Sequence, residues 1–186
     1  QDLAANTSYY VYVKSLCDAE EGKWNLVGVS FTTDCAPFLE LPFKENFDNY
    51  ASSSTKNPPS CWTTFHNGLM SPDANYPSIY KPTGTTTNCL YWYLASTYKA
   101  ENKRPTLASL PIEDVSRVMV SFQLKSPNSS YAPKLAIGYA TDVSSIAKLM
   151  ETVQYVDTIT PTKDWVEYSV LMAEAESIKA HLVFTQ

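Results

Sequence analysis

The stretch Tyr9-Tyr10-Val11-Tyr12-Val13-Lys14 sets the pattern from which the fold can be inferred. Successive side chains of an extended chain point to opposite faces, so the odd-numbered residues share one face and the even-numbered residues share the other. This apolar period of two indicates a β-strand. Polar residues 18–23 interrupt the pattern, and residues 26–33 follow as a second strand-like run. The two runs predict a hairpin with a long tip.

Residues 35–42 form a short connector that contains two prolines, and we expect a domain boundary there. An isolated two-stranded hairpin is marginally stable in water. We therefore expect residues 1–34 to be the end of a domain whose other strands are absent here, or to borrow partner strands elsewhere.

Beyond the connector, short strand-like runs recur between turn-forming residues. They cover residues 43–47, 61–65, 78–80, 89–94, 117–125, 134–140, 153–159, 165–170 and 180–184. Residues 144–151 are the exception, because Ile146, Leu149 and Met150 recur at helical spacing after Asp142, a suitable N-cap. Many short strands without alternating helices predict an all-β fold, built as an antiparallel sandwich or barrel with one short helix.

The composition argues against several classes of function. With 44% hydrophobic and 18% charged residues, the chain is globular. Its net charge is −5 and its 14 Lys and Arg form no cluster, which disfavours nucleic-acid binding because that needs a basic footprint. No apolar run approaches the roughly 20 residues of a membrane span. The sequence begins without a leader pattern, so we expect any signal peptide to have been removed or to lie upstream.

The first hairpin carries a recognisable pattern. Leu3, Thr7, Tyr9, Val11 and Val13 match Leu-x-Pro-x-Thr-x-Tyr-x-Val-x-Val in register, with Ala5 in place of the proline. Residues 1–34 therefore resemble the last two strands of a fibronectin type III domain, with residues 29–33 as the final strand. The resemblance implies an incomplete Ig-like domain with a tyrosine corner, in which the Tyr9 hydroxyl bonds to backbone upstream.

Seven short pieces follow in a fixed order. They are Pro42-Phe43-Lys44-Glu45-Asn46-Phe47-Asp48, Cys61-Trp62, Tyr76-Pro77-Ser78, Leu110-Pro111, Val120-Ser121-Phe122, Ile137-Gly138-Tyr139-Ala140-Thr141-Asp142 and Trp165-Val166-Glu167-Tyr168. The ordered set resembles the jelly-roll modules that follow fibronectin-type domains in exported proteins of Bacteroidetes-like bacteria, which are similar to MAM domains and to cleaved-adhesin modules of gingipain-type proteases. The resemblance implies that residues 35–186 form an antiparallel jelly-roll β-sandwich that lacks its last strand.

The four cysteines fit neither a zinc nor a redox CxxC pattern. Cys17 and Cys35 would lie at opposite ends of the hairpin, about 30 Å apart, which is too far for a disulfide. In MAM domains a cysteine before the Phe-Glu strand is joined to the Cys of the following Cys-x-Trp, so the resemblance implies a Cys35–Cys61 disulfide. Four reduced thiols remain the alternative, with Cys89 as a small buried apolar residue.

No pattern of catalytic residues stands out. His66 and His181 are the only histidines, and we expect the first in an exposed turn and the second in a strand. The carboxylate pairs Glu113/Asp114 and Glu174/Glu176 are expected to be structural or solvated, the former at the start of a strand. The sequence therefore predicts that the chain is not an enzyme.

Glu45 and Asp48 are the carboxylates of most interest. In similar jelly rolls, oxygen ligands near the first strand join the last strand to hold a structural Ca²⁺, and carboxylate oxygens are ligands that Ca²⁺ prefers. The resemblance thus implies Ca²⁺ at Glu45 and Asp48, and no other cofactor is expected.

Exposed aromatic rings are the features that would bind sugars, because the C–H faces of sugars pack on flat π surfaces. Tyr76, Tyr80, Trp92 and Tyr93 are the predicted ligand-binding platform, and ordinary sandwich packing is the alternative for the same rings.

Taken with the resemblance, these residues predict a non-catalytic, extracellular or cell-surface bacterial module of a larger multidomain protein. It would bind carbohydrate, or a host or cell-surface protein, in adhesion. The alternative is an accessory or spacer module of an exported protease or glycoside hydrolase whose catalytic domain lies outside this chain. Because missing strands leave open sheet edges, a strand-exchanged homodimer is also expected.

Overall fold

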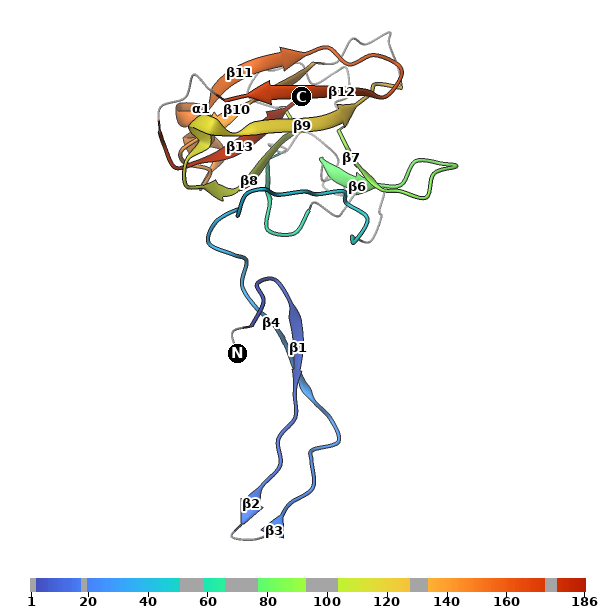
Figure 1. Cartoon of the computed structure of the whole chain (residues 1–186), viewed down its shortest axis with the longest axis vertical. Coiled ribbons are helices and arrows are strands. Elements are labelled where there is room, and N and C mark those ends of the chain that lie inside the picture. Colours follow the sequence, from blue (N-terminus) through green and yellow to red (C-terminus); the bar gives the residue numbers. More distant parts are fainter. Residues whose placement is uncertain are drawn as a thin grey trace. The chain divides into compact units, whose positions relative to one another are not determined.

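The computed structural model describes residues 3–17, 20–50, 59–65, 77–92, 104–127, 134–172 and 177–186. The chain divides into two units, Gln1–Ala36 and Pro37–Gln186, and this division falls two residues beyond the predicted boundary. The described strands pair antiparallel, and one short α-helix accompanies them (Figure 1). The predicted all-β, antiparallel fold class with a short helix is confirmed. In this described part, no helix has the length and apolar character that crossing a bilayer needs.

The first unit is a hairpin. Strands β1 (Ser8–Val11) and β4 (Val29–Thr32) pair antiparallel, and β2 (Leu16–Cys17) and β3 (Glu20–Glu21) pair near its tip. Tyr9 stacks on Phe31 across the pair with ring centroids 5.8 Å apart. The Tyr9 hydroxyl accepts a hydrogen bond of 2.8 Å from the Ala4 backbone N–H. This is the contact with upstream backbone that the tyrosine-corner prediction requires.

Where the structure describes it, the second unit forms one large sheet and two strand pairs. The five-stranded sheet has the order β11-β10-β13-β8-β5, and β12-β9 and β6-β7 form the two pairs. The bounds are β5 Thr63–Phe65, β6 Ser78–Tyr80, β7 Cys89–Tyr91, β8 Thr106–Ile112, β9 Met119–Leu124, β10 Leu135–Ala140, β11 Gln154–Ile159, β12 Val166–Leu171 and β13 Ala180–Thr185. Strands far apart in sequence are neighbours in the large sheet, which a simple meander does not produce and a jelly roll does.

Two layers enclose the main core. Ile112, Ile137 and Leu182 of the large sheet pack with Val170 of β12, and Val120 and Phe122 of β9 pack against the same cluster. The β9–β12 pair therefore lies face to face with the large sheet, as in a β-sandwich (Figure 1). Helix α1 (Ile146–Thr152) places Leu149 in a second cluster with Ala108, Ala140 and Val183 of the large sheet.

A bulge in β8 changes which side chains reach the main core. The register between β13 and β8 shifts from His181↔Pro111 to Val183↔Ala108, so β8 has one extra residue there. Pro111 has no N–H to give to a ladder. The Ser109 hydroxyl fills the break by accepting a 2.9 Å hydrogen bond from the buried Leu182 N–H.

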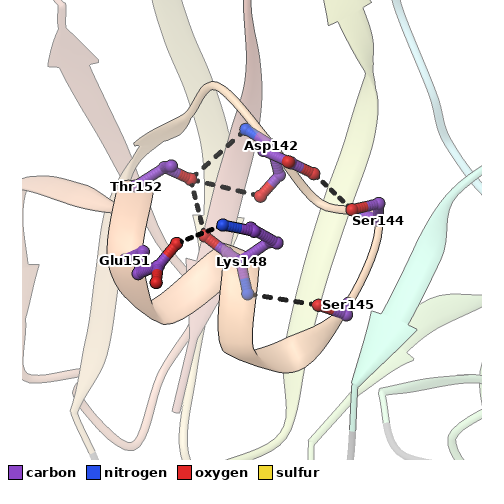
Figure 2. A network of polar contacts seen from close by, with 6 residues as sticks. All are labelled: Asp142, Ser144, Ser145, Lys148, Glu151 and Thr152. Carbon is purple, nitrogen blue, oxygen red and sulfur yellow. Dashed lines mark hydrogen bonds and ion pairs between the residues drawn. The ribbon is translucent and has the colours of Figure 1, made fainter.

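A polar network sets the start of α1 (Figure 2). Ser145 is the N-cap and accepts a hydrogen bond of 3.2 Å from the Lys148 N–H. Asp142, which the sequence suggests as the cap, instead accepts from the Ser144 N–H at 2.8 Å. Hydrogen bonding from the Ser144 hydroxyl, and then from the Ser144 N–H, lowers the pKa of the Asp142 carboxyl. The prediction of a helix is correct, and its N-cap lies three residues later than expected.

Beyond small shifts at strand ends, the structure differs from the prediction in three places. Residues 43–47 form no strand, because their polar groups bond locally within a turn, as described below. Asp114 caps the 3₁₀ turn Val115–Arg117 and does not open a strand. The sequence does not predict β8 because Pro105 and Pro111 flank or interrupt it, yet it is an interior strand of the large sheet.

Candidate functional site

A cavity of about 750 Å³ lies in the second unit, and we call it the groove. Three segments supply most of its lining. They are residues 118–127, which include β9, residues 87–92, which include β7, and residues 39, 41 and 43–47, which lie in the connector or directly after it. Exposed residues such as Met119 take part in the lining, so the groove opens to solvent.

The groove runs along strand edges rather than over a strand face. Every residue from Val118 to Pro127 lines it, and so does every residue from Thr87 to Trp92. Alternate side chains of a strand point to opposite faces, so a cavity above one face would meet only every second residue. The unbroken runs therefore place the groove beside the edges of β9 and β7.

Those two strands belong to different pairs. Within the described residues, β9 pairs with β12 alone and β7 pairs with β6 alone. Two strand edges that are not bonded to each other thus border one groove.

Four aromatic rings that contact one another in sequence line the same groove. Phe43 and Trp62 have ring centroids 6.5 Å apart, and Trp62 lies 6.4 Å from Phe184. Phe184 in turn meets Phe122 edge-on at 6.2 Å. All four rings are lining residues, so an apolar side chain entering the groove would meet an aromatic surface.

Two buried polar atoms at the groove have no hydrogen-bond partner. They are Nε1 of Trp92, which can only donate, and Oε1 of Gln186, which can only accept. Both residues line the groove. Buried polar groups are normally hydrogen-bonded, so each unpaired group needs an explanation.

The groove is positively charged, although the chain as a whole is acidic. Its charged lining residues are Lys44, Glu45, Lys125 and Lys134, against a net charge of −5 for the chain. The Lys125 ammonium lies 4.8 Å from the centroid of the Trp165 ring, which is 47% exposed. Burial raises the pKa of the Cys89 thiol, and the charge of Lys125 opposes that rise. Because the Lys125 charge acts on the Cys89 thiol, Lys125 after the end of β9 lies near the start of β7.

A set of hydrogen bonds, which we call the Asn88 clasp, ties residues 45–50 to the turn before β7. The Asn88 side chain donates to the carbonyl oxygens of Phe47 at 2.9 Å and of Tyr50 at 3.0 Å. The Asn88 backbone N–H donates to Oδ1 of Asp48 at 2.8 Å. Glu45 accepts from the Phe47 N–H at 2.7 Å and from the Tyr50 hydroxyl at 3.0 Å. The clasp therefore fixes one end of the groove.

The clasp bears on the predicted Ca²⁺ site at Glu45 and Asp48. Both oxygens of Glu45 and one oxygen of Asp48 already accept protein hydrogen bonds, so a cation would compete with those donors. Within the described ranges, no group of three or more His, Cys, Asp or Glu residues is arranged to hold a metal. The structure thus gives these two carboxylates a role in holding a turn, and Ca²⁺ binding stays a prediction. Burial and the neighbouring Glu45 raise the pKa of Tyr50 to about 12.

The predicted aromatic platform is only partly visible. Tyr80 packs on Tyr91 with ring centroids 5.2 Å apart and does not line the groove. Trp92 lines the groove and packs against the main core. Tyr76 and Tyr93 lie outside the described residues. The rings brought together at the groove are instead Phe43, Trp62, Phe122, Phe184 and Trp165, which the sequence analysis does not single out as a site.

The structure also places the predicted histidines and cysteines. Nδ1 of His181 lies 2.7 Å from the Ser109 carbonyl oxygen, and His66 and the pair Glu174/Glu176 lie outside the described residues. Cys35 and Cys61 are disulfide-bonded, whereas Cys17 and Cys89 are free thiols. Two bonded and two free cysteines are what the predicted Cys35–Cys61 disulfide requires.

Sequence reasoning missed the groove because no local signal marks it. Its walls come from segments that are separated by tens of residues, and Lys44, Lys125 and Lys134 are isolated lysines in the sequence. Comparison with family models, curated proteins and solved structures finds no match to this chain.

Proposed function

We propose that this chain is a non-catalytic binding module, exposed on the cell surface or secreted, which holds its ligand in the groove. The observation that carries the proposal is the solvent-open groove itself, which is lined by aromatic rings and by three lysines. An apolar, aromatic hollow with a few convergent polar groups is the usual form of a ligand site.

The ligand classes that fit are a carbohydrate or a surface protein. Trp165 offers an exposed aromatic ring beside a lysine, which suits the apolar face of a sugar with a hydroxyl or carboxylate next to it. The resemblance to fibronectin type III and to MAM-like or cleaved-adhesin modules supports an adhesive role within a larger exported bacterial protein. Fold alone does not give function, so the groove carries the proposal.

The second candidate is an accessory or spacer module of an exported protease or glycoside hydrolase. The hairpin of the first unit favours it, because several of its apolar side chains, among them Leu26 and Val27, are almost fully exposed and would suit packing on neighbouring domains. The same exposed hairpin supports a strand-exchanged homodimer as a possible assembly.

Glycan-array screening followed by calorimetry, with and without Ca²⁺, tests the binding role. We expect binding that weakens about tenfold in Trp165→Ala, a loss of roughly 1.4 kcal/mol for one stacking ring. Trp24→Ala is the matched control, because Trp24 is also exposed, also lies near a lysine, Lys14, and does not line the groove. If no glycan or surface protein binds in either condition, the spacer role is favoured. Dependence on Ca²⁺ that Glu45→Gln removes would support the predicted metal.

A further inference from the structure

We propose that the outward-facing side of the β9–β12 pair binds a neutral glycan chain, which stacks on Trp165 and forms hydrogen bonds with Gln123 and Glu167. This inference rests on the proposed binding role and names the class of its ligand. Its basis is the order in which the two paired strands present their exposed side chains.

Alternate side chains of this pair point away from the core. Val120 and Phe122 of β9 pack against the main core, so the residues between and beside them point to the opposite side. The outward-facing residues, which we call the outer face, are Met119, Ser121, Gln123 and Lys125 with Leu171, Ser169, Glu167 and Trp165. All but the half-buried Lys125 are exposed. Trp165 and the β9 side of the outer face line the groove.

The strand register arranges the outer face in cross-strand pairs. These pairs are Met119 with Leu171, Ser121 with Ser169 and Gln123 with Glu167. Lys125 and Trp165 follow as the next pair, because the Lys125 ammonium lies 4.8 Å from the centroid of the Trp165 ring. A strand rises about 3.4 Å per residue, so successive pairs are about 7 Å apart and the strip is about 20 Å long. A strip of this length suits a chain of sugar units.

The side chains of the strip match the two chemical features of a sugar. Trp165 is 47% exposed and offers a flat π surface to a C–H face. Gln123 can donate and accept, whereas the Glu167 carboxylate only accepts. Within the part of the chain that the structure describes, neither of these two side chains is hydrogen-bonded. Sugar hydroxyls both donate and accept, so they can bond to both side chains.

The charges of the outer face select a neutral sugar. Lys125 and Glu167 lie on the same face, one cross-strand pair apart, and they carry opposite charges. The carboxylate of an acidic sugar that approached Lys125 would lie about 7 Å from the next pair, which contains Glu167. Like charges in such proximity disfavour binding. A neutral sugar avoids that repulsion and keeps the hydrogen bonds.

The order of apolar and polar residues argues against a protein partner. A protein interface has an apolar centre and a polar rim. On the outer face, Met119 and Leu171, which are 63% and 49% exposed, lie at one end, and Trp165 lies at the other. The polar pairs lie between these ends, with the two serine hydroxyls 2.8 Å apart. The arrangement is the reverse of a protein interface.

Isothermal titration calorimetry with the whole chain tests this proposal. The neutral probes are cellohexaose, xylohexaose, mannohexaose and maltohexaose, and the acidic probe is hexagalacturonate. We expect at least one neutral probe to bind, and we expect hexagalacturonate to bind more weakly than that probe. The variants below are measured with the neutral probe that binds the wild-type chain most tightly.

Gln123→Ala should raise the Kd about fivefold, because the amide loses its hydrogen bonds to the sugar. Glu167→Ala should have a similar effect. Gln154→Ala is the matched control, because Gln154 is also an exposed glutamine in a strand, β11, and does not line the groove. The control should bind as the wild-type chain does. Thermal unfolding of each variant checks that these exposed substitutions leave the fold intact.

The other outcomes separate this inference from the proposed binding role. Tighter binding of hexagalacturonate than of any neutral probe would overturn the neutral sugar and leave the binding role standing. A neutral probe that binds Gln123→Ala and Glu167→Ala as tightly as the wild-type chain would lie away from the outer face, which overturns this inference alone. If no probe binds, this inference fails. The binding role fails as well only if the glycan array and a screen of surface proteins also give no binding.

Discussion

Removing the Asn88 side chain should release the turn that closes one end of the groove. In Asn88→Ala, the carbonyl oxygens of Phe47 and Tyr50 lose their part-buried donors, which lie at 2.9 and 3.0 Å. The net contribution of one such hydrogen bond is about 1 kcal/mol. The free energy of unfolding of the second unit should therefore fall by about 2 kcal/mol, and the urea midpoint by about 1 M.

The measurement is urea unfolding followed by tryptophan fluorescence in a Trp24→Phe background. The other three tryptophans, Trp62, Trp92 and Trp165, belong to the second unit, so this background reports that unit alone. Asn46→Ala is the matched control, since its side chain accepts a single exposed bond of 3.2 Å from the Asp48 N–H. We expect the control to lose about 0.5 kcal/mol or less. Equal losses in the two variants would refute the assignment of the clasp to Asn88.

Three further perturbations test the second unit. Gly138→Ala should destabilise by about 3 kcal/mol, because a Cβ there would lie 1.9 Å from the Gln154 carbonyl oxygen. Gly84→Ala has open space and should lose only about 1 kcal/mol from its positive φ; similar melting temperatures for the two variants would contradict the close approach of Gly138 to Gln154. Ser109→Ala leaves the buried Leu182 N–H without its acceptor and should lose about 1–3 kcal/mol in thermal unfolding, and a neutral result would show that another group replaces the hydroxyl. The pKa of Tyr50 is raised to about 12, so the folded chain favours the neutral phenol. The resulting contribution to the free energy of unfolding is complete below pH 10 and is lost as the pH rises toward 12. Tyr50→Phe should flatten that alkaline decline and remove one late-titrating phenol from the absorbance at 295 nm; an unchanged titration curve would count against the shift.

Much of the secondary structure could be predicted from residue patterns. The run 117–125 alternates and contains β9 (Met119–Leu124), whose side chains are alternately exposed and half-buried. Such a strand buries one face, so the period of two is written in the sequence. Strand β8 could not be predicted in this way, because it carries Pro111 and a bulge that reverses its alternation. Its place is fixed by β13 and β5 on either side, which are tertiary neighbours.

The candidate site shows the same division. Sequence reasoning singled out Glu45 and Asp48 through the resemblance to jelly-roll modules. It could not place Asn88, which lies some forty residues later and donates its backbone N–H to Oδ1 of Asp48. The hydrogen bond of the Tyr9 hydroxyl could be predicted, because its partner, the Ala4 N–H, is only five residues away. Local partners leave a local signal, and distant ones do not.

The sequence by itself determined the all-β class, the short helix and the hairpin at the start of the chain, because each follows from the periodicity of neighbouring residues. The tertiary structure alone decided that β9 and β7 face one groove, that Lys44, Lys125 and Lys134 share its lining, and that Trp92 and Gln186 keep buried polar atoms without partners. The physical reason is that segments far apart in the sequence line this groove, and only the packing of the whole unit brings them together.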